Sequence, residues 1–391
     1  MRKRAGIVVV AHLCALLYFI GAPTASADVR PFGTVTPTAG PRTCPTGYSC
    51  SGLTVTCPGL QLVGTANVAI KSPTAPARGV LLTFSGANGE EWYNSVGSRT
   101  EDMLADLRAN GIETAMVSWP YGWIFTADGE GPGIAANACR PASVIKYLYD
   151  TVYTPLGLSK TRGVCGFCLT GSSGGATQVA YSLVYYALGP LVDAAVPTGG
   201  PVIDDVIAGC FGTPPGYEFT PQIKKVDAAY GYNGTSGPCD LRDTSYTDLF
   251  RADSISYTTN LLPDTRFNFV LGSSDDKRNI AQVRTFEARL IANGCSMVTE
   301  TMVASGHTVQ TNPEGIAMIT AAVLAGPSAT TTTPCATSST GSTGSTGSTS
   351  TTTSSSTSSS TTTTTTKVTT TTTGRTTTTR PPRTTTTVAP N

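Results

Sequence analysis

The chain has 391 residues, and its 26 lysines and arginines nearly balance its 25 aspartates and glutamates, which leaves a formal net charge of +1. Only 13% of the residues are charged, and they form no runs within residues 28–328, which argues against nucleic acid as a partner. Beyond the N-terminal segment no apolar run approaches about 18 residues, so we expect no membrane span in the rest of the chain.

Residues 1–27 have the pattern of a secretory signal peptide. Three basic residues, Arg2–Arg4, precede an apolar stretch that ends near Ala22, and residues 25–27 read Ala-Ser-Ala, a small-residue cleavage site. A membrane anchor is the alternative for this segment, but the cleavage site favours removal. We therefore expect an exported protein, secreted or at the cell surface, whose mature chain starts near Asp28.

The number of cysteines indicates the compartment of the protein. Eleven are present, and ten remain once Cys14 leaves with the signal, an even number that is typical of a disulfide framework in an exported protein. Cys165 and Cys168 have the spacing of half a zinc site or a redox motif. Since residues three apart in a strand point to opposite faces, we favour burial or long-range bridging for both. Cys295 and Cys335 could pin the start of the C-terminal segment to the domain.

The predicted elements begin after a lead rich in Pro, Gly and Thr, residues 28–60, which we expect to be strapped across the domain. Residues 198–263 form a loop-rich stretch that resists assignment. Strands are expected within 61–70 and at 79–85, 113–119, 164–170, 191–196, 267–272 and 296–303, and helices at 101–110, 142–153, 178–187, 279–293 and 313–324.

Strands that alternate with helices predict an α/β fold with a mostly parallel sheet covered on both faces. Right-handed crossovers place the loops that follow these strands along one edge of the sheet, where active sites of such folds form. From about residue 329 the composition changes to Ser and Thr with scattered Gly and Pro. Such a segment buries too little apolar surface to fold, so residues 329–391 are expected to be a disordered stalk, open to O-glycosylation, behind a single domain at 28–328.

Residues 164–176 read VCGFCLTGSSGGA, an apolar run that breaks at Gly171–Gly175 and continues into a helical pattern. A G-x-S-x-G sequence between a strand and a helix resembles the nucleophile elbow of the α/β-hydrolase superfamily, and the resemblance extends over about residues 79–326. It implies the α/β-hydrolase fold and places Ser173 at the nucleophile position. A Gly/Ser-rich loop that merely turns the chain is the alternative.

A nucleophilic serine needs a base, and the base needs a group that orients it. His12 lies in the signal, so His307 is the only histidine expected in the mature chain. It lies in the loop before the last helix, where the superfamily carries its catalytic histidine. An inconsequential surface histidine is the alternative.

For the acid, the resemblance to a G-x-x-D at the end of the preceding strand selects Asp275 in Gly-Ser-Ser-Asp-Asp, and the order Ser, Asp, His matches that of the superfamily. Asp276 is the near rival, and Asp204 and Asp205 are more distant ones. An N-cap of the following helix is the structural alternative for Asp275, and one of the adjacent pair could have that role.

Acyl transfer also needs backbone N–H groups aimed at the developing oxyanion. The expected donors are Gly174, which follows the nucleophile, and Ala87 in the Ser-Gly-Ala-Asn-Gly loop at 85–89. This loop resembles the His-Gly-containing loop of esterases and lipases, with Ser85 where histidine is usual. An ordinary Gly/Asn turn is the alternative. The three tryptophans, Trp92, Trp119 and Trp123, are predicted in loops at the same edge, where they could pack an apolar or aromatic substrate group or serve the core.

These features predict a secreted serine hydrolase that cleaves carboxylic esters through a Ser-His-Asp triad and an acyl-enzyme intermediate, with no cofactor or metal. Its substrate would be a small-molecule or polymeric ester, and the stalk suggests polymeric, cell-wall or plant-derived material. A serine peptidase of the same fold is one alternative. A non-catalytic surface or adhesive protein on a hydrolase scaffold is the other.

Overall fold

The computed structural model describes residues 29–41, 43–158, 165–259, 262, 265–294 and 297–325. These residues all belong to one structural unit, Met1–Ser338. The predicted signal peptide and stalk, and the predicted link between Cys295 and Cys335, lie outside the described residues and stay predictions.

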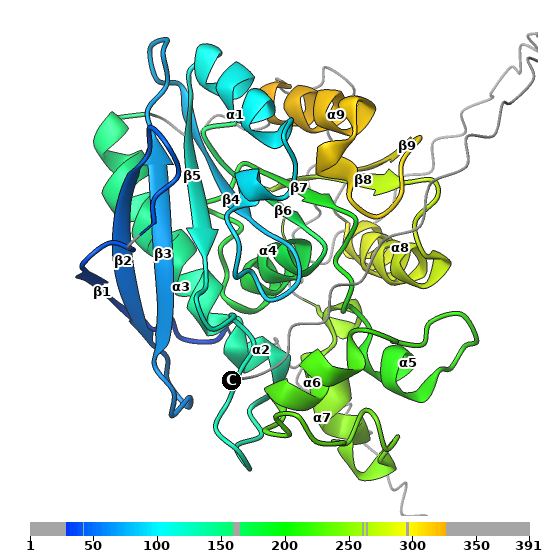
Figure 1. Cartoon of the computed structure of the whole chain (residues 1–391). Coiled ribbons are helices and arrows are strands. Elements are labelled where there is room, and N and C mark those ends of the chain that lie inside the picture. The colour runs from blue at the N-terminus through cyan, green and yellow to red at the C-terminus, as the bar shows by residue number, and fades with distance from the viewer. Residues whose placement is uncertain are drawn as a thin grey trace, which may run out of the picture. The chain divides into compact units, whose positions relative to one another are not determined.

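The described residues form a nine-stranded sheet in the order β1-β2-β3-β5-β4-β6-β7-β8-β9 (Figure 1). β4 to β9 run parallel to one another, whereas β1, β2 and β3 are antiparallel additions at one edge. The strands are β1 (Thr34–Thr38), β2 (Ser49–Thr56), β3 (Gly64–Lys71), β4 (Gly79–Phe84), β5 (Ile112–Ser118), β6 (Phe167–Ser172), β7 (Ala194–Thr198), β8 (Arg266–Gly272) and β9 (Val298–Val303). Every residue of β4, β5, β6 and β7 is buried, which is why these strands read as continuous apolar runs.

Helices cover both faces of the sheet, as Figure 1 shows. On one face lie α1 (Thr100–Ala109) and α9 (Pro313–Leu324), whose buried side chains share a hydrophobic cluster with Leu81 and Met116. On the other face lie α3 (Cys139–Leu148), α4 (Gly174–Tyr185) and α8 (Lys277–Ala292), and their cluster takes alternate residues of the same strands. The predicted α/β class, with a mostly parallel sheet covered on both faces, is confirmed. Single turns of 3-10 or π type occur at Tyr93–Ser95, Tyr149–Tyr153, Thr154–Leu156, Thr244–Tyr246, Ile255–Tyr257 and Val309–Thr311.

The N-terminal lead corrects one expectation. Instead of a strap across the domain, it forms β1 and β2, which extend the sheet. Leu53 and Val55 of β2 point into the core, and a disulfide from Cys57 to Cys139 ties the end of β2 to α3. β2 has only two or three apolar side chains, too few to form a recognisable strand pattern in a stretch rich in Pro, Gly and Thr.

Cys165 and Cys168 also differ from the expectation. Both are buried, as expected, but they are bonded to each other and not to distant cysteines. β6 begins at Phe167, so Cys165 precedes the strand, and the rule that strand residues three apart point to opposite faces does not apply to the pair. The other disulfides of the described residues join Cys44 to Cys50 and Cys210 to Cys239.

The unassigned stretch between β7 and β8 contains three short helices, α5 (Val206–Phe211), α6 (Ile223–Ala229) and α7 (Thr247–Asp253). A fourth short helix, α2 (Gly133–Asn137), comes earlier in the chain and lies beside them (Figure 1). Helices of five to seven residues are too short to show a 3.6-residue period, which explains why the sequence did not reveal them. No helix in the described part of the chain is both long and apolar enough to span a bilayer.

Candidate active site

The turn between β6 and α4 holds Ser173 in a strained backbone conformation, with φ 55° and ψ −113°. Its N–H donates to the carbonyl of Thr198 at 2.9 Å, so the neighbouring strand β7 supports the turn. A Cβ on Gly171 would collide with the backbone of Gly175, and one on Gly175 would collide with the carbonyl of Phe84. Glycines are therefore required here for β4, β6 and α4 to approach one another, as in the elbow that the sequence resembles.

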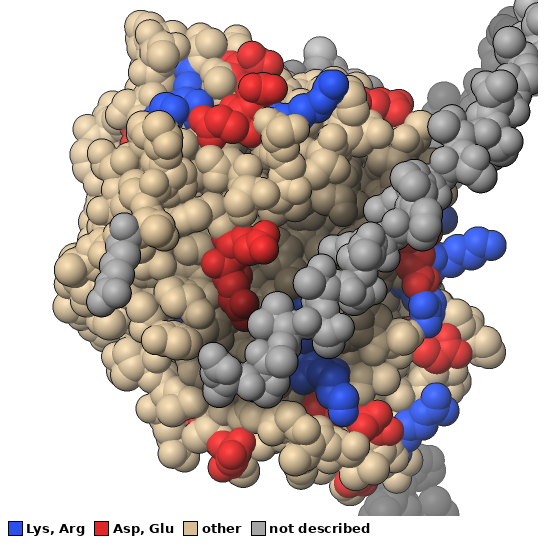
Figure 2. Space-filling view, viewed as in Figure 1, with Lys and Arg blue, Asp and Glu red and all other residues tan. Residues whose placement is uncertain are grey.

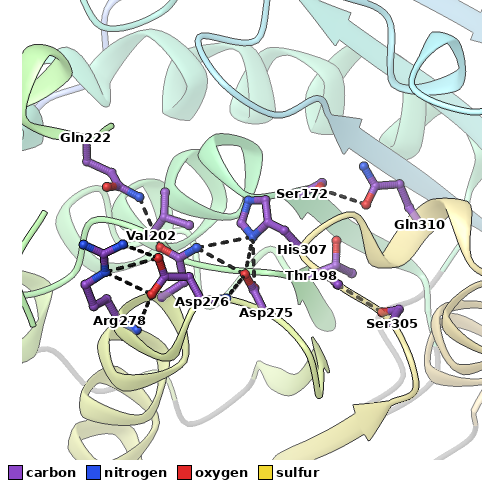
Figure 3. A network of polar contacts seen from close by, with 12 residues as sticks. Ser172, Thr198, Val202, Gln222, Asp275, Asp276, Arg278, Ser305, His307 and Gln310 are labelled. Carbon is purple, nitrogen blue, oxygen red and sulfur yellow. Dashed lines mark hydrogen bonds and ion pairs between the residues drawn. The ribbon is translucent and has the colours of Figure 1, made fainter. Parts of the chain in front are cut away.

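His307 and Asp275 meet at the same edge of the sheet. The Nδ1 atom of His307, in the loop after β9, lies 2.9 and 3.0 Å from the two carboxylate oxygens of Asp275, in the loop after β8 (Figure 3). The side chain of Asp275 is 2% exposed, whereas that of His307 is 38% exposed. A carboxylate at Nδ1 favours the tautomer with its proton on Nδ1, which leaves Nε2 able to accept one.

The rival acids have other partners. Asp276 caps α8 by accepting from the N–H of Arg278 and pairs with its guanidinium, and these bonds lower the pKa of Asp276. Asp205 caps α5 by accepting from the N–H of Ala208 at 2.9 Å. Asp204 is fully buried, and burial followed by repulsion from Asp205 raises its pKa well above the usual value. None of the three contacts His307 among the hydrogen bonds of the described residues.

Asn279, which sequence reasoning missed, contacts both members of the His–Asp pair. Its amide Nδ2 lies 3.3 Å from Asp275 Oδ1 and 3.4 Å from His307 Nδ1, and its Oδ1 accepts from Gln222 at 3.1 Å. Asn279 is one helical turn after Asp275, a spacing that could have identified it. Gln222 comes from the unassigned stretch and carried no signal.

A second polar link joins β6, the strand before Ser173, to the loop that carries His307. Ser172 Oγ donates to Gln310 Oε1 at 2.9 Å, and both side chains are at least 97% buried (Figure 3). The backbone carbonyl of Gln310 in turn accepts from Thr100 Oγ1 of α1. The residue before Ser173 and the loop that carries His307 are thus fixed relative to each other.

The loop after β4 packs against the elbow. Ala87 has φ 51° and borders Gly174, since a Cβ on Gly174 would collide with the carbonyl of Ala87. The hydroxyl of Ser85 donates to the carbonyl of Glu91 at 2.6 Å. A second bond from Gly89 N–H to the carbonyl of Gly86 closes the turn. Ser85 therefore stabilises this loop through a hydrogen bond to another residue of the same loop.

One cavity of about 510 Å³ brings these parts together. Ser173, His307 and Ala87 line it, together with side chains from α6 and the loop after β4. Figure 2 shows this face, with acidic side chains gathered at one border of a hollow. The lining residues are Ser85, Gly86, Ala87, Asn88, Glu90, Glu91, Val96, Ser172, Ser173, Val202, Pro221, Gln222, Lys225, Asn279, His307, Thr308 and Gln310.

The tryptophans do not line this cavity. Trp119 and Trp123 follow β5 as expected, but both are fully buried in the core, and the indole N–H of Trp119 donates to Gln178 of α4 at 2.8 Å. Trp92 is half-buried against the cluster under α1. For Trp119 and Trp123 the hypothesis that they pack a substrate group is wrong, because both are fully buried in the core, a direction of the indole that the sequence does not reveal.

Among the described residues, no group of three or more His, Cys, Asp or Glu side chains is placed to hold a metal ion. The groups present at the site are a hydroxyl, an imidazole and a carboxylate, with backbone N–H groups beside them.

No family model and no curated protein matches the sequence. Solved structures with a similar fold include a brefeldin A esterase, a bacterial homologue of human hormone-sensitive lipase, which is 16% identical over 72% of this chain and 78% of its own, with a TM-score of 0.47. An arylesterase is 14% identical over 76% of this chain and 87% of its own, with a TM-score of 0.45. A bacterial heroin esterase is 17% identical over 72% of this chain and 86% of its own, with a TM-score of 0.47.

Proposed function

We propose that this protein is a serine hydrolase that cleaves carboxylic esters, with Ser173 as nucleophile, His307 as general base and Asp275 as the acid that orients the histidine. The observation that carries the proposal is the buried Asp275 carboxylate on Nδ1 of His307, because His307 lines the same cavity as the strained Ser173. Acyl transfer requires a nucleophile, a base that a third group orients, and N–H donors for the oxyanion, and Ser173, His307, Asp275 and the loop after β4 are the proposed counterparts.

In the proposed reaction, His307 Nε2 takes the proton of Ser173 Oγ as the oxygen attacks the ester carbonyl. The N–H groups of Gly174 and Ala87 hold the oxyanion, and each such donor is worth about 2.7–4 kcal/mol of the barrier. The imidazolium then protonates the departing alcohol, which leaves an acyl-enzyme. Water, deprotonated by the same imidazole, attacks the acyl group and releases the acid and free Ser173.

The proposal includes export. Eight cysteines of the described residues are joined in four disulfides, which persist in oxidising compartments. The predicted signal peptide supports the same compartment, and the predicted stalk supports a polymeric, cell-wall or plant-derived ester as substrate.

The test is labelling with a fluorophosphonate probe together with hydrolysis of 4-nitrophenyl acetate and butyrate. We expect Ser173→Ala to abolish labelling and to reduce kcat by about 10⁴-fold or more. Ser95→Ala, which changes an exposed serine that does not line the cavity, is the control and should still be labelled. Labelling or hydrolysis that survives in Ser173→Ala contradicts the proposal.

Esters and amides with the same acyl group distinguish an esterase from a peptidase. We expect faster turnover of the esters, and faster turnover of the amides would favour the peptidase. Well-folded wild-type protein that neither labels nor hydrolyses any ester would favour a non-catalytic surface role.

A further inference from the structure

Two adjacent lysines on α6 have different surroundings. Lys224 is 61% exposed and lies 3.4 Å from Asp240. Lys225 turns to the other side and lines the cavity that contains Ser173 and His307. The backbone N–H of Lys225 donates to the carbonyl of Gln222, but its side-chain ammonium has no ion pair or hydrogen bond with any described residue. Desolvation lowers the pKa of Lys225, and the charge of Glu90 opposes this shift only in part.

The helix that carries Lys225 is firmly held. Asp227 of α6 accepts from the N–H groups of Gly237 and Cys239, at 3.1 and 2.8 Å, and the disulfide from Cys239 to Cys210 ties that loop to α5. Val226 is fully buried on the same helix. The backbone that presents Lys225 to the cavity is therefore fixed, so only the Lys225 side chain has to be ordered when a ligand binds.

Across the cavity, the loop after β4 contributes the opposite charge. Glu90 and Glu91 are both exposed at the border, and Glu90 accepts from Asn88 at 3.2 Å. Neither reaches Lys225 as an ion pair. Figure 2 shows basic side chains over α6 and acidic side chains on the other side of the hollow. A substrate with negative charge on both sides would be repelled by the glutamates, whereas one with a single anionic group toward α6 would fit.

We propose that Lys225 is a specificity-determining residue that binds a carboxylate of the substrate, so that the preferred substrates are esters with one free carboxylate. The inference rests on the proposed function of the same cavity. A carboxylate would supply the acceptors that the protein does not offer to this ammonium, in charge-assisted hydrogen bonds that strengthen away from bulk water. The reaction is unchanged: the ester bond is hydrolysed while the free carboxylate keeps its charge.

The experiment compares matched pairs of esters. One series carries the carboxylate on the acyl chain: 4-nitrophenyl monoesters of adipate, pimelate and suberate against the hexanoate, heptanoate and octanoate. The second carries it on the leaving group: the acetyl ester of 4-hydroxybenzoate against that of 4-hydroxybenzamide. The measured quantity is the ratio of kcat/KM for the charged ester to that for its neutral partner.

We expect the wild-type ratio to exceed one in at least one series, and Lys225→Met to lower it by about 10- to 100-fold. Lys225→Arg keeps the charge and should retain part of the preference. Lys224→Met is the matched control on the neighbouring residue and should leave the ratio unchanged. Glu90→Gln removes a negative charge that would repel the substrate carboxylate, and it should raise the ratio.

A wild-type ratio of one or less in both series overturns the inference, as does a ratio that Lys225→Met leaves unchanged. Ser173-dependent hydrolysis of the neutral esters would show in those cases that the proposed function survives without it. Folded wild-type protein that hydrolyses none of the esters would contradict the proposed function and the inference with it.

Discussion

A single amide group at residue 279 touches both partners of the proposed acid–base pair. Asn279 donates to Asp275 and lies 3.4 Å from the ring nitrogen of His307, while Gln222 holds its other end. It therefore limits how the carboxylate and the imidazole can rotate relative to each other. This is a positioning role, because Asn279 does not itself exchange a proton in the proposed reaction.

Replacing Asn279 with alanine should lower kcat by about tenfold and change KM less, because the interaction serves the proton transfer and not ground-state binding. The measurement is steady-state hydrolysis of a 4-nitrophenyl ester, with the thermal midpoint recorded in parallel. Asn293→Ala removes an amide at the other end of α8, where it donates to Thr258, and is the control. A kcat for Asn279→Ala within twofold of wild type would show that the pair needs no such support.

Ser85 holds the loop that carries the proposed oxyanion donor Ala87. Without its bond to the carbonyl of Glu91, the loop can drift from the position of the developing oxyanion. We expect Ser85→Ala to lower kcat by about three- to tenfold and the free energy of unfolding by about 0.5–1.5 kcal/mol. Ser95→Ala removes a similar bond, to the carbonyl of Trp92, and should leave kcat unchanged. Equal effects of the two variants on kcat would argue against an oxyanion role for the loop.

At the scale of elements, the close approach of α4 to β4 determines the position of the proposed nucleophile, Ser173. A Cβ on Gly175 would lie 2.2 Å from the carbonyl oxygen of Phe84, and backbone atoms cannot give way as a side chain can. Gly175→Ala should therefore push the helix from the sheet, lower the free energy of unfolding by about 1–3 kcal/mol and reduce kcat.

Urea denaturation and ester hydrolysis measure the two effects of Gly175→Ala. Gly131→Ala is the control, because a Cβ there meets only the carbonyl of Tyr230 at 3.7 Å, an ordinary contact. If Gly175→Ala is as stable and as active as Gly131→Ala, the tight packing of strand and helix is not what positions Ser173.

The short helix α6 shows how an element outside the main alternation shapes the site. It lies in the stretch between β7 and β8. Lys225 of α6 and Gln222, the residue before the helix, both line the cavity. One of these supports Asn279, and the other carries the proposed specificity. In the proposed enzyme, the loops that follow the parallel strands carry the reacting groups, and the stretch between β7 and β8 carries the residue that selects the substrate.

At the scale of the whole molecule, Glu101 joins the N-terminal lead to the rest of the domain. It accepts hydrogen bonds from Tyr48 in the lead, from Asn94, and from Arg108 on α1. Partial burial by itself raises the pKa of Glu101, but these bonds outweigh it, and the pKa is below the usual 4.5. A carboxyl with a lowered pKa stabilises the fold above its unfolded-state pKa, and this stability is lost as pH falls through the folded-state pKa.

Glu101→Gln should therefore lower the free energy of unfolding by about 1 kcal/mol at pH 7, a figure that allows for solvent screening of a side chain that is 36% exposed. The difference from wild type should shrink as pH falls through the folded-state pKa of Glu101. Urea titrations of wild type and variant from pH 3 to 7 measure the difference. Asp106→Asn, an exposed carboxylate on the same helix, should show no comparable pH dependence. A difference that stays constant with pH would mean that the ionised form of Glu101 is not what stabilises the junction.

The sequence by itself determined the alternating order of strands and helices, because buried parallel strands must be continuous apolar runs and their helices must be amphipathic. It also determined the strand–turn–helix around Ser173, since only glycines permit such close backbone contacts. The candidate base followed from elimination, as His307 is the only histidine after the predicted signal. Each of these depends on residue type and on neighbours close in the chain.

Only the tertiary structure decided what depends on the direction of a side chain or on contacts between distant segments. It placed Asp275, and not the adjacent Asp276, against His307, a choice that one residue of loop register reverses. It turned Trp119 into the core and Lys225 into the cavity, and it paired the lead with the sheet edge. The physical reason is that the spacing of apolar residues along the chain indicates helix or strand. The orientation of side chains in loops and short helices, by contrast, is set by packing against residues far away in the chain.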